Sequence, residues 1–168
     1  GVVSSLVGFL GHESGSTGEV TVTGAGSRWN NSNSLYVGGN GSGTLNVEAG
    51  GELSNSIGHI GHHPGSTGIA TVTGAGSQWN NADWLWVGLS GTATLNVIDG
   101  GVVSNTIGHL ALLSTATGIA TVTGAGSRWD NSSNFYVGRN GAGTLNVEAG
   151  GVVSSLVGFL GHESGSTG

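Results

Sequence analysis

Apolar and polar residues alternate over short stretches of this chain. In Gly68–Thr73, the apolar residues Ala70 and Val72 are separated and followed by Thr71 and Thr73. The same alternation recurs in segments 35–37 and 45–47. A period of two is typical of a strand with one buried face and one face in water. Glycine recurs every few residues and breaks any helix longer than a turn. The pattern therefore predicts short β-strands.

The chain is internally repetitive. The hexapeptide Val-Thr-Gly-Ala-Gly-Ser begins at positions 22, 72 and 122, which gives a period of 50 residues. The segment 151–168 is identical to the segment 1–18. We therefore expect a single domain over 1–168, made of repeats 1–50, 51–100 and 101–150 followed by a partial repeat, 151–168.

Each repeat divides again into two equal halves. One position of the half-repeat is always valine: Val22, Val47, Val72, Val97, Val122 and Val147. Two further positions are almost always glycine: Gly1, Gly26, Gly51, Gly76, Gly101, Gly126 and Gly151, and then Gly18, Gly43, Gly68, Ala93, Gly118, Gly143 and Gly168. The structural unit is thus the half-repeat, and it occurs in two alternating versions.

A 25-residue unit of short strands predicts one coil of a β-solenoid. Stacked coils lie about 4.8 Å apart, so each residue meets its own copy above and below. The valine positions would fill the interior, and the glycine positions suit corners with positive φ or close backbone approach. A propeller blade needs about 40 residues. We expect an all-β, right-handed parallel β-helix with a 50-residue double-coil repeat.

The two versions of the coil differ in where extra residues lie. Val37-Gly38 comes late in its coil, whereas Ile57-Gly58 comes early, before His59–Pro64. If Val37 and Ile57 occupy the same strand, the extra residues form loops at different corners of alternate coils. We expect two rows of loops that folding does not require.

Charge and composition narrow the possible functions. Only 7% of residues are charged, the net charge is −6, and Arg28, Arg128 and Arg139 are the only cations besides histidine. So few basic groups exclude nucleic acid and anionic membranes as natural partners. Without cysteine there is no disulfide scaffold, thiol catalysis or thiolate-bound zinc. The 36% apolar content and five tryptophans are too hydrophobic for disorder. Because no signal peptide and no initiator methionine are present, we expect a mature product or a fragment.

The repeated motifs resemble a known bacterial repeat. They are VTGAGSxW, LYVGxNGxGTLNVEAGGVVS and IGH followed by GSTGIATVTGAGS, and they recur over the whole chain. They are similar to the type V secretion and PEP-CTERM-associated repeat of autotransporter passenger domains and other bacterial surface proteins. The resemblance implies a parallel β-helix that is secreted, extracellular or on the bacterial cell surface. It supplies no catalytic residues.

Three aromatic residues are the candidate binding residues. Tyr36, Trp86 and Tyr136 stand 50 residues apart, each between apolar neighbours. Alternation would place the neighbours inside and the three rings outside, about 10 Å apart, or two coil rises. Such a row could stack on sugar rings of a surface glycan or on a protein partner, or simply cover an apolar flank.

Other residue clusters have simpler explanations. His59, His62 and His63 could bind a transition metal. However, the third repeat has Leu112 and Leu113 at the last two positions, so we expect a solvated loop, no metal and no cofactor. Tryptophans recur three residues after a glycine and alternate with Ser54 and Ser104, which suggests packing at a corner. These tryptophans are Trp29, Trp79 and Trp129.

Ice binding and catalysis remain further alternatives. Thr-x-Thr pairs on alternate coils resemble the surface of solenoid ice-binding proteins, although Asn46, Asn96 and Asn146 stand between them. Parallel β-helices also include polysaccharide lyases and hydrolases. Here, Glu48 and Glu148 are repeat copies about 19 Å apart, four coil rises, too far for a glycosidase pair. We expect no enzyme.

The sequence therefore favours a structural or adhesive solenoid. A soluble solenoid normally covers its ends with atypical polar caps. Here 1–18 and 151–168 are ordinary coil segments. We expect head-to-tail self-association into filaments, and the alternative is a carbohydrate-binding surface module that uses Tyr36, Trp86 and Tyr136.

Overall fold

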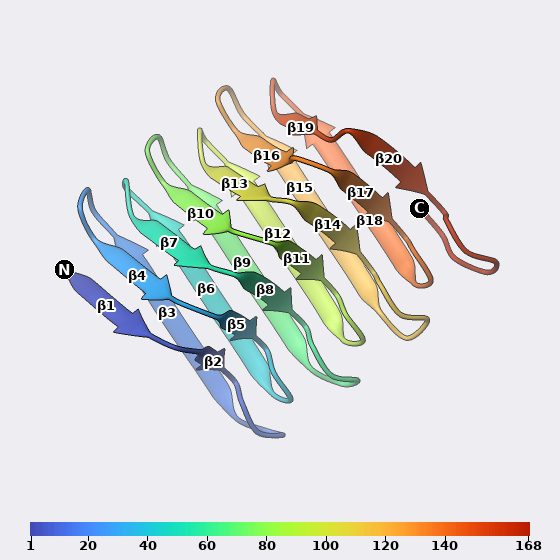
Figure 1. Ribbon diagram of the computed structural model, residues 1–168, viewed down its shortest axis with the longest axis horizontal. Helices are drawn as coiled ribbons and strands as arrows, with labels where there is room; N and C mark the ends of the chain where they lie inside the picture. The colour runs from blue at the N-terminus through green and yellow to red at the C-terminus, as the bar shows by residue number, and fades with distance from the viewer.

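The computed structural model describes all residues, 1–168, and consists of strands without any helix (Figure 1). The strands form three parallel sheets, here called A, B and C. No helix is therefore available to cross a membrane. The predicted all-β solenoid with parallel strands and 25-residue coils is confirmed.

Each coil contributes one strand to each sheet in turn. Sheet A contains β1 (Val2–Ser5), β4 (Arg28–Asn31), β7 (Glu52–Asn55), β10 (Gln78–Asn81), β13 (Val102–Asn105), β16 (Arg128–Asn131) and β19 (Val152–Ser154). Sheet B contains β2 (Gly8–Leu10), β5 (Ser34–Val37), β8 (Ile57–Ile60), β11 (Trp84–Val87), β14 (Ile107–Leu110), β17 (Asn134–Val137) and β20 (Val157–Leu160). Sheet C contains β3 (Thr17–Thr23), β6 (Ser42–Glu48), β9 (Thr67–Thr73), β12 (Thr92–Ile98), β15 (Thr117–Thr123) and β18 (Ala142–Glu148).

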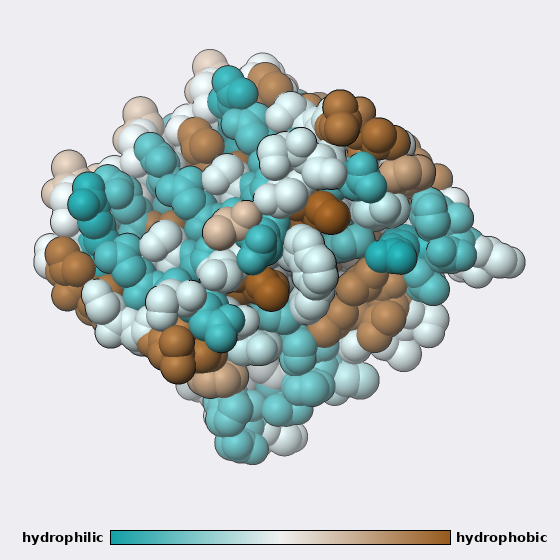
Figure 2. All heavy atoms as spheres, viewed as in Figure 1, coloured by the Kyte–Doolittle hydropathy of each residue, from teal (hydrophilic) through white to brown (hydrophobic).

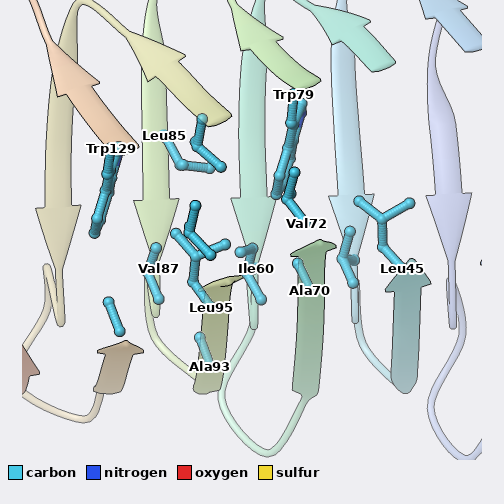
Figure 3. Packing of buried hydrophobic residues seen from close by; sticks show 14 of the residues in the cluster. Leu45, Ile60, Ala70, Val72, Trp79, Leu85, Val87, Ala93, Leu95 and Trp129 are labelled. Carbon is cyan, nitrogen blue, oxygen red and sulfur yellow. The ribbon is translucent and has the colours of Figure 1, made fainter. Parts of the chain in front are cut away.

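The three sheets make two layers. In Figure 1 the strands of sheets A and B follow one another in the front layer, and the longer strands of sheet C lie behind them. The buried side chains fill the space between the layers and form one continuous core along the stack (Figure 3).

Sheet C keeps the predicted 25-residue step throughout. Val72 pairs with Val47 on one side and with Val97 on the other, and the column continues in both directions. Five of the six valines are buried, as predicted. The sixth, Val147, is 46% exposed because β18 is the last strand of sheet C.

Sheets A and B do not keep this step. In sheet A, Arg28 pairs with Val2 and with Glu52, so the sequence separation of paired residues alternates between 26 and 24. In sheet B, Leu35 pairs with Gly8 and with Gly58, so the separation there alternates between 27 and 23. The average length of a coil is the same in all three sheets, because an extra residue at one corner is compensated at another.

This alternation overturns the expected register of sheet B. Val37 pairs with Ile60, whereas Ile57 lies opposite Ser34. Segment His59–Pro64 is therefore a loop only from Gly61 onward: His59 and Ile60 belong to β8 and are buried. The connections from sheet B to sheet C do alternate in length, but the longer one begins only at Gly61, as in segment 61–66 compared with 38–41.

The glycine that opens these connections has a left-handed conformation. Gly61 has φ of 65°, and a Cβ on it would lie 2.4 Å from the backbone oxygen of Thr92 in the next coil. Both observations explain why glycine recurs there. In the third repeat the position is Ala111, which keeps a positive φ of 56°.

Two other expectations based on a uniform step are also wrong. Gly26 and Gly51 do not stack, because Glu52 donates its backbone N–H to Ser27, which places Gly51 beside Ser27. Trp29 lies opposite Leu53, not Ser54. The tryptophans belong to strands of sheet A and point inward, so they are core residues rather than corner packing.

Bulky and small core residues alternate from coil to coil. The coil of β10–β12 places Trp79, Leu85 and Leu95 inside, whereas its neighbour, β7–β9, places Leu53, Gly58 and Ala70 at the paired positions. A Cβ on Gly58 would lie 2.8 Å from Leu85 Cδ1 and 3.0 Å from Trp79 Cζ2. The bulky side chains thus extend over the small residues of the next coil (Figure 3), which explains why the repeat contains two coils.

A buried polar row accompanies the tryptophans. The indole Nε1–H of Trp79 donates to Asn55 Oδ1 at 2.7 Å, and Asn55 Nδ2 donates to Asn81 Oδ1 at 2.6 Å. Trp129, Asn105 and Asn131 repeat this arrangement with the same distances. Each indole N–H is therefore satisfied although its ring is fully buried.

Candidate functional site

A continuous row of rings runs along the outer face of sheet B. The register places an aromatic or histidine side chain at the same position of every coil. We call this row the ring ladder, and its members in order are Phe9, Tyr36, His59, Trp86, His109, Tyr136 and Phe159.

Most neighbours in the ring ladder stack on one another. Phe9 and Tyr36 lie 4.9 Å apart between ring centroids with planes 6° apart, and Tyr36 and His59 lie 4.3 Å apart at 11°. At the other end, Tyr136 stacks on His109 at 4.7 Å and on Phe159 at 4.7 Å. The distance between neighbouring rings is close to the distance between neighbouring strands, because consecutive rings of the ladder belong to strands that pair with each other.

The ring ladder changes the interpretation of the three candidate binding residues. Tyr36, Trp86 and Tyr136 alternate with buried neighbours and are half-buried themselves. The expected gaps between them are filled by rings from the intervening coils. Both faces of Tyr36 and of Tyr136 are covered, so neither offers a free face to a sugar ring.

The histidines belong to this ladder and to the turn beside it. His59 Nδ1 and His62 Nδ1 are 2.9 Å apart, so one imidazole donates an N–H to the other. Burial lowers the pKa of His59 to about 3, helped by the nearby charges of His62 and His63. Burial, and then the charge of His63, also lowers the pKa of His62.

The expectation of a solvated histidine loop is therefore wrong for His59, which is a buried strand residue. The geometry does not bring three histidine, aspartate or glutamate side chains together in a way that could hold a metal ion. What this group of histidines forms is an edge-to-face cluster: His62 lies across both Tyr36 and His59, with ring centroids 4.9 and 4.6 Å away.

The third repeat lacks the partner histidine. His109 occupies the position of His59, but Leu112 replaces His62. Nδ1 of His109 is buried and has no hydrogen-bond partner. Burial lowers the pKa of His109 to about 4, and the charge of Arg139 adds to this shift.

A small hollow opens on the outer face of sheet B at this place. It has a volume of about 170 Å³ and spans β11, β14, β17 and the turns that follow β14 and β17. It is lined by Trp84, Trp86, Ile107, His109, Leu112, Tyr136 and Arg139. We call it the Trp84–Arg139 hollow.

The remaining candidates show no comparable arrangement. The threonine pairs and the asparagines alternate along sheet C in the predicted order, as in the pairing of Asn96 with Thr71 and Thr121. Glu48 and Glu148 lie in one column of sheet C, four strands apart.

The fold and this surface define a parallel β-solenoid repeat protein with a ring ladder on one outer face. Comparison of the chain with protein-family models, curated proteins and solved structures finds no match.

Proposed function

We propose that the protein is a structural or adhesive element that stacks end to end into filaments. The observation that carries this proposal is the state of the two end coils. Residues that are fully buried in inner coils are exposed there: Leu160 is 72% exposed where Leu110 is buried, and Val3 is 59% exposed where Val103 is buried. Figure 2 shows apolar surface at the left beside β1 and at the upper right beside β19.

The end strands also carry unused backbone hydrogen-bonding groups. In sheet C, β3 pairs only with β6, and the outer edge of β18 carries only a single bridge, from Ala142 to Thr167. Unpaired strand edges with apolar side chains are templates for pairing with another chain. A head-to-tail contact of this kind is heterologous, and it grows as a filament unless it closes into a ring.

The two edges of sheet C match each other. Inside the stack, strands with leucine before the valine alternate with strands that have a smaller residue there, as Leu95 alternates with Ala120. The edge strand β18 has Leu145 and Val147, whereas β3 has Val20 and Val22. Placing β3 of one copy on β18 of another would continue this alternation where segment 1–18 of the second copy takes the place of segment 151–168 of the first, to which it is identical in sequence.

The resemblance of the repeats to secreted bacterial surface proteins supports a place outside the cell. We therefore propose that the filaments are extracellular or attached to the cell surface. The proposal needs no catalytic group, cofactor or metal. We do not extend it to sugar binding along the whole ring ladder, because neighbouring rings cover the faces that would stack on sugars.

Light scattering and electron microscopy of the purified 16.4 kDa chain test the proposal. We expect a mass that rises with concentration, and filaments that diffract at about 4.8 Å along their axis. Val147→Lys should prevent assembly without unfolding the chain, because Val147 is exposed in the single chain and covered only in the filament. The control is Ile69→Lys, which adds the same charge to the lateral face of sheet C. End-to-end stacking would be refuted if the unmodified chain, like Val147→Lys, stayed a dispersed monomer at every concentration.

A further inference from the structure

The Trp84–Arg139 hollow lies at a break in the ring ladder. Every other neighbouring pair of the ladder is in ring contact, including His59 and Trp86 at 4.6 Å. Trp86 and His109 are not in such contact, and the hollow is lined by both. Instead of stacking on His109, the indole of Trp86 lies against Trp84, with ring centroids 5.4 Å apart and planes tilted by 36°.

The residues around this break are exceptions to the repeat. Trp84 stands where the other coils with bulky core residues have Ser34 and Asn134. Arg139 stands where the chain elsewhere has Gly39 or Leu89. Packing of the coils does not require Trp84 and Arg139, because the other repeats pack with different residues at these two positions. The two exceptions therefore indicate a role that is specific to this place on the surface.

Arg139 is the one arginine without a carboxylate partner. Arg28 forms an ion pair with Glu52 at 3.0 Å, and Arg128 forms one with Asp130 at 3.0 Å. The guanidinium of Arg139 instead lies 5.2 Å from the ring centroid of Tyr136, in a chain whose net charge is −6. Since His109 is neutral near pH 7, Arg139 is the only charged group that lines the hollow.

The hollow also has an accessible aromatic lining. Trp84 is 41% exposed, and with Trp86 it forms the indole part of the lining, which also includes Arg139. An indole surface buries the C–H face of a sugar ring, and a free guanidinium forms charge-assisted, bidentate hydrogen bonds with a carboxylate. The volume of about 170 Å³ is below the roughly 300–1,000 Å³ of sites for larger ligands, which limits the occupant to a single ring.

We propose that the Trp84–Arg139 hollow binds one carboxylated sugar residue, such as a uronic acid of an acidic glycan, with the sugar ring on Trp84 and Trp86 and its carboxylate on Arg139. This site is independent of end-to-end stacking, because it lies on the lateral face of inner coils. It would give the solenoid a ligand on its side while its ends remain free to assemble.

A matched pair of sugars tests the proposal on the full chain. Methyl β-glucuronide and methyl β-glucoside share one ring and differ only in a carboxylate or a hydroxymethyl group. We titrate each into the protein and follow the indole N–H signals by nuclear magnetic resonance. We expect the glucuronide to bind at least about tenfold more tightly, because a charge-assisted hydrogen bond contributes about that factor or more.

The repeat itself supplies the variants. Arg139→Leu introduces the residue found at the corresponding position 89, and it should remove the preference for the glucuronide. Trp84→Ser introduces the residue found at position 34, and it should weaken binding of both sugars several-fold and identify the Trp84 signal. Arg28→Gln, which removes an arginine already paired with Glu52, is the control and should change neither affinity.

Three results would overturn the proposal. The first is equal affinity for the two sugars, and the second is a glucuronide preference that survives in Arg139→Leu. The third is binding of benzoate, a flat aromatic carboxylate, without binding of the glucuronide, which would make the hollow a site for aromatic anions. The circular dichroism spectrum of each variant shows whether it has kept its fold, so a loss of binding can be separated from unfolding.

Discussion

Sheet C and the paired sheets A and B follow different rules within the same coils. Sheet C advances by the same 25-residue step everywhere, so each residue meets its own copy. In sheet A the sequence separation of paired residues alternates between 26 and 24, and in sheet B between 27 and 23. The chain compensates each shift at the next corner, so the coils still stack.

The difference teaches where a repeat protein can vary. A constant step pairs residues of the same position in the half-repeat, which are identical in the valine column of sheet C and alternate beside it, as Leu95 does with Ala120. An alternating step brings together residues from different positions of the half-repeat, such as Trp79 with Asn55 in sheet A and His59 with Tyr36 in sheet B. The buried polar row and the candidate site both lie on the sheets whose step alternates.

The largest expected effect on stability comes from a substitution in sheet C, where the step is constant. Val97→Asp places an unpaired carboxylate in the fully buried valine column and should destabilise the fold by about 4 kcal/mol or more. Val147→Asp changes the same column where it is exposed and should cost well under half as much. Urea unfolding followed by circular dichroism measures both, and equal losses would contradict the inward register.

A smaller effect is expected in the polar row of sheet A. Asn105→Leu would leave the indole N–H of Trp129 and the Oδ1 of Asn131 without partners. The expected loss is about 2–4 kcal/mol in the free energy of unfolding. Adding Trp129→Phe to this variant should recover part of the stability that the unpaired N–H costs. Asn80→Leu, on the exposed face of the same sheet, is the control, and an equally large loss there would argue against the buried row.

The smallest effect concerns acid and the ring ladder of sheet B. His59 and His109 are neutral in the folded chain down to pKa values of about 3 and 4, whereas an unfolded histidine titrates near 6.5. The unfolded chain therefore binds more protons below pH 6.5, so stability falls as the pH falls towards these folded values. At pH 5 each histidine should account for a loss of about 2 kcal/mol relative to neutral pH.

His109→Phe should remove its share of this pH dependence while keeping an aromatic ring in the ladder. Thermal melts between pH 5 and 8 measure the effect. A pH dependence that is the same in His109→Phe and in the unmodified chain would contradict burial of that imidazole as its source.

Sheet C could be predicted well from the sequence, because the same residue, as in the valine column, recurs there at a fixed spacing. The valine column and the alternation around Val72 needed no knowledge of the other strands. The same fixed spacing failed in sheets A and B. It aligned Trp29 with Ser54 although Trp29 pairs with Leu53, and it treated His59 as a loop residue although His59 belongs to the ring ladder.

The candidate site could be predicted only in part. Alternation placed Trp86 and Tyr136 outside correctly, because each stands between buried neighbours. The hollow depends on how rings from adjacent coils pack, which a pattern along one strand does not contain. Trp84 and Arg139 carried one available signal: both depart from the residues at the corresponding repeat positions.

The chain winds through sheets A, B and C in turn, so each coil finishes one layer above its own start, on a spiral ramp rather than on a flat face (Figure 1). A growing crystal with a screw dislocation has the same geometry: each added row finds a ledge, and completing a turn recreates the ledge one layer higher. No new layer ever has to be nucleated, which removes the costly first step of ordering. A chain that folds onto such a ramp can extend strand by strand at a nearly constant free-energy gain per coil, whatever its length.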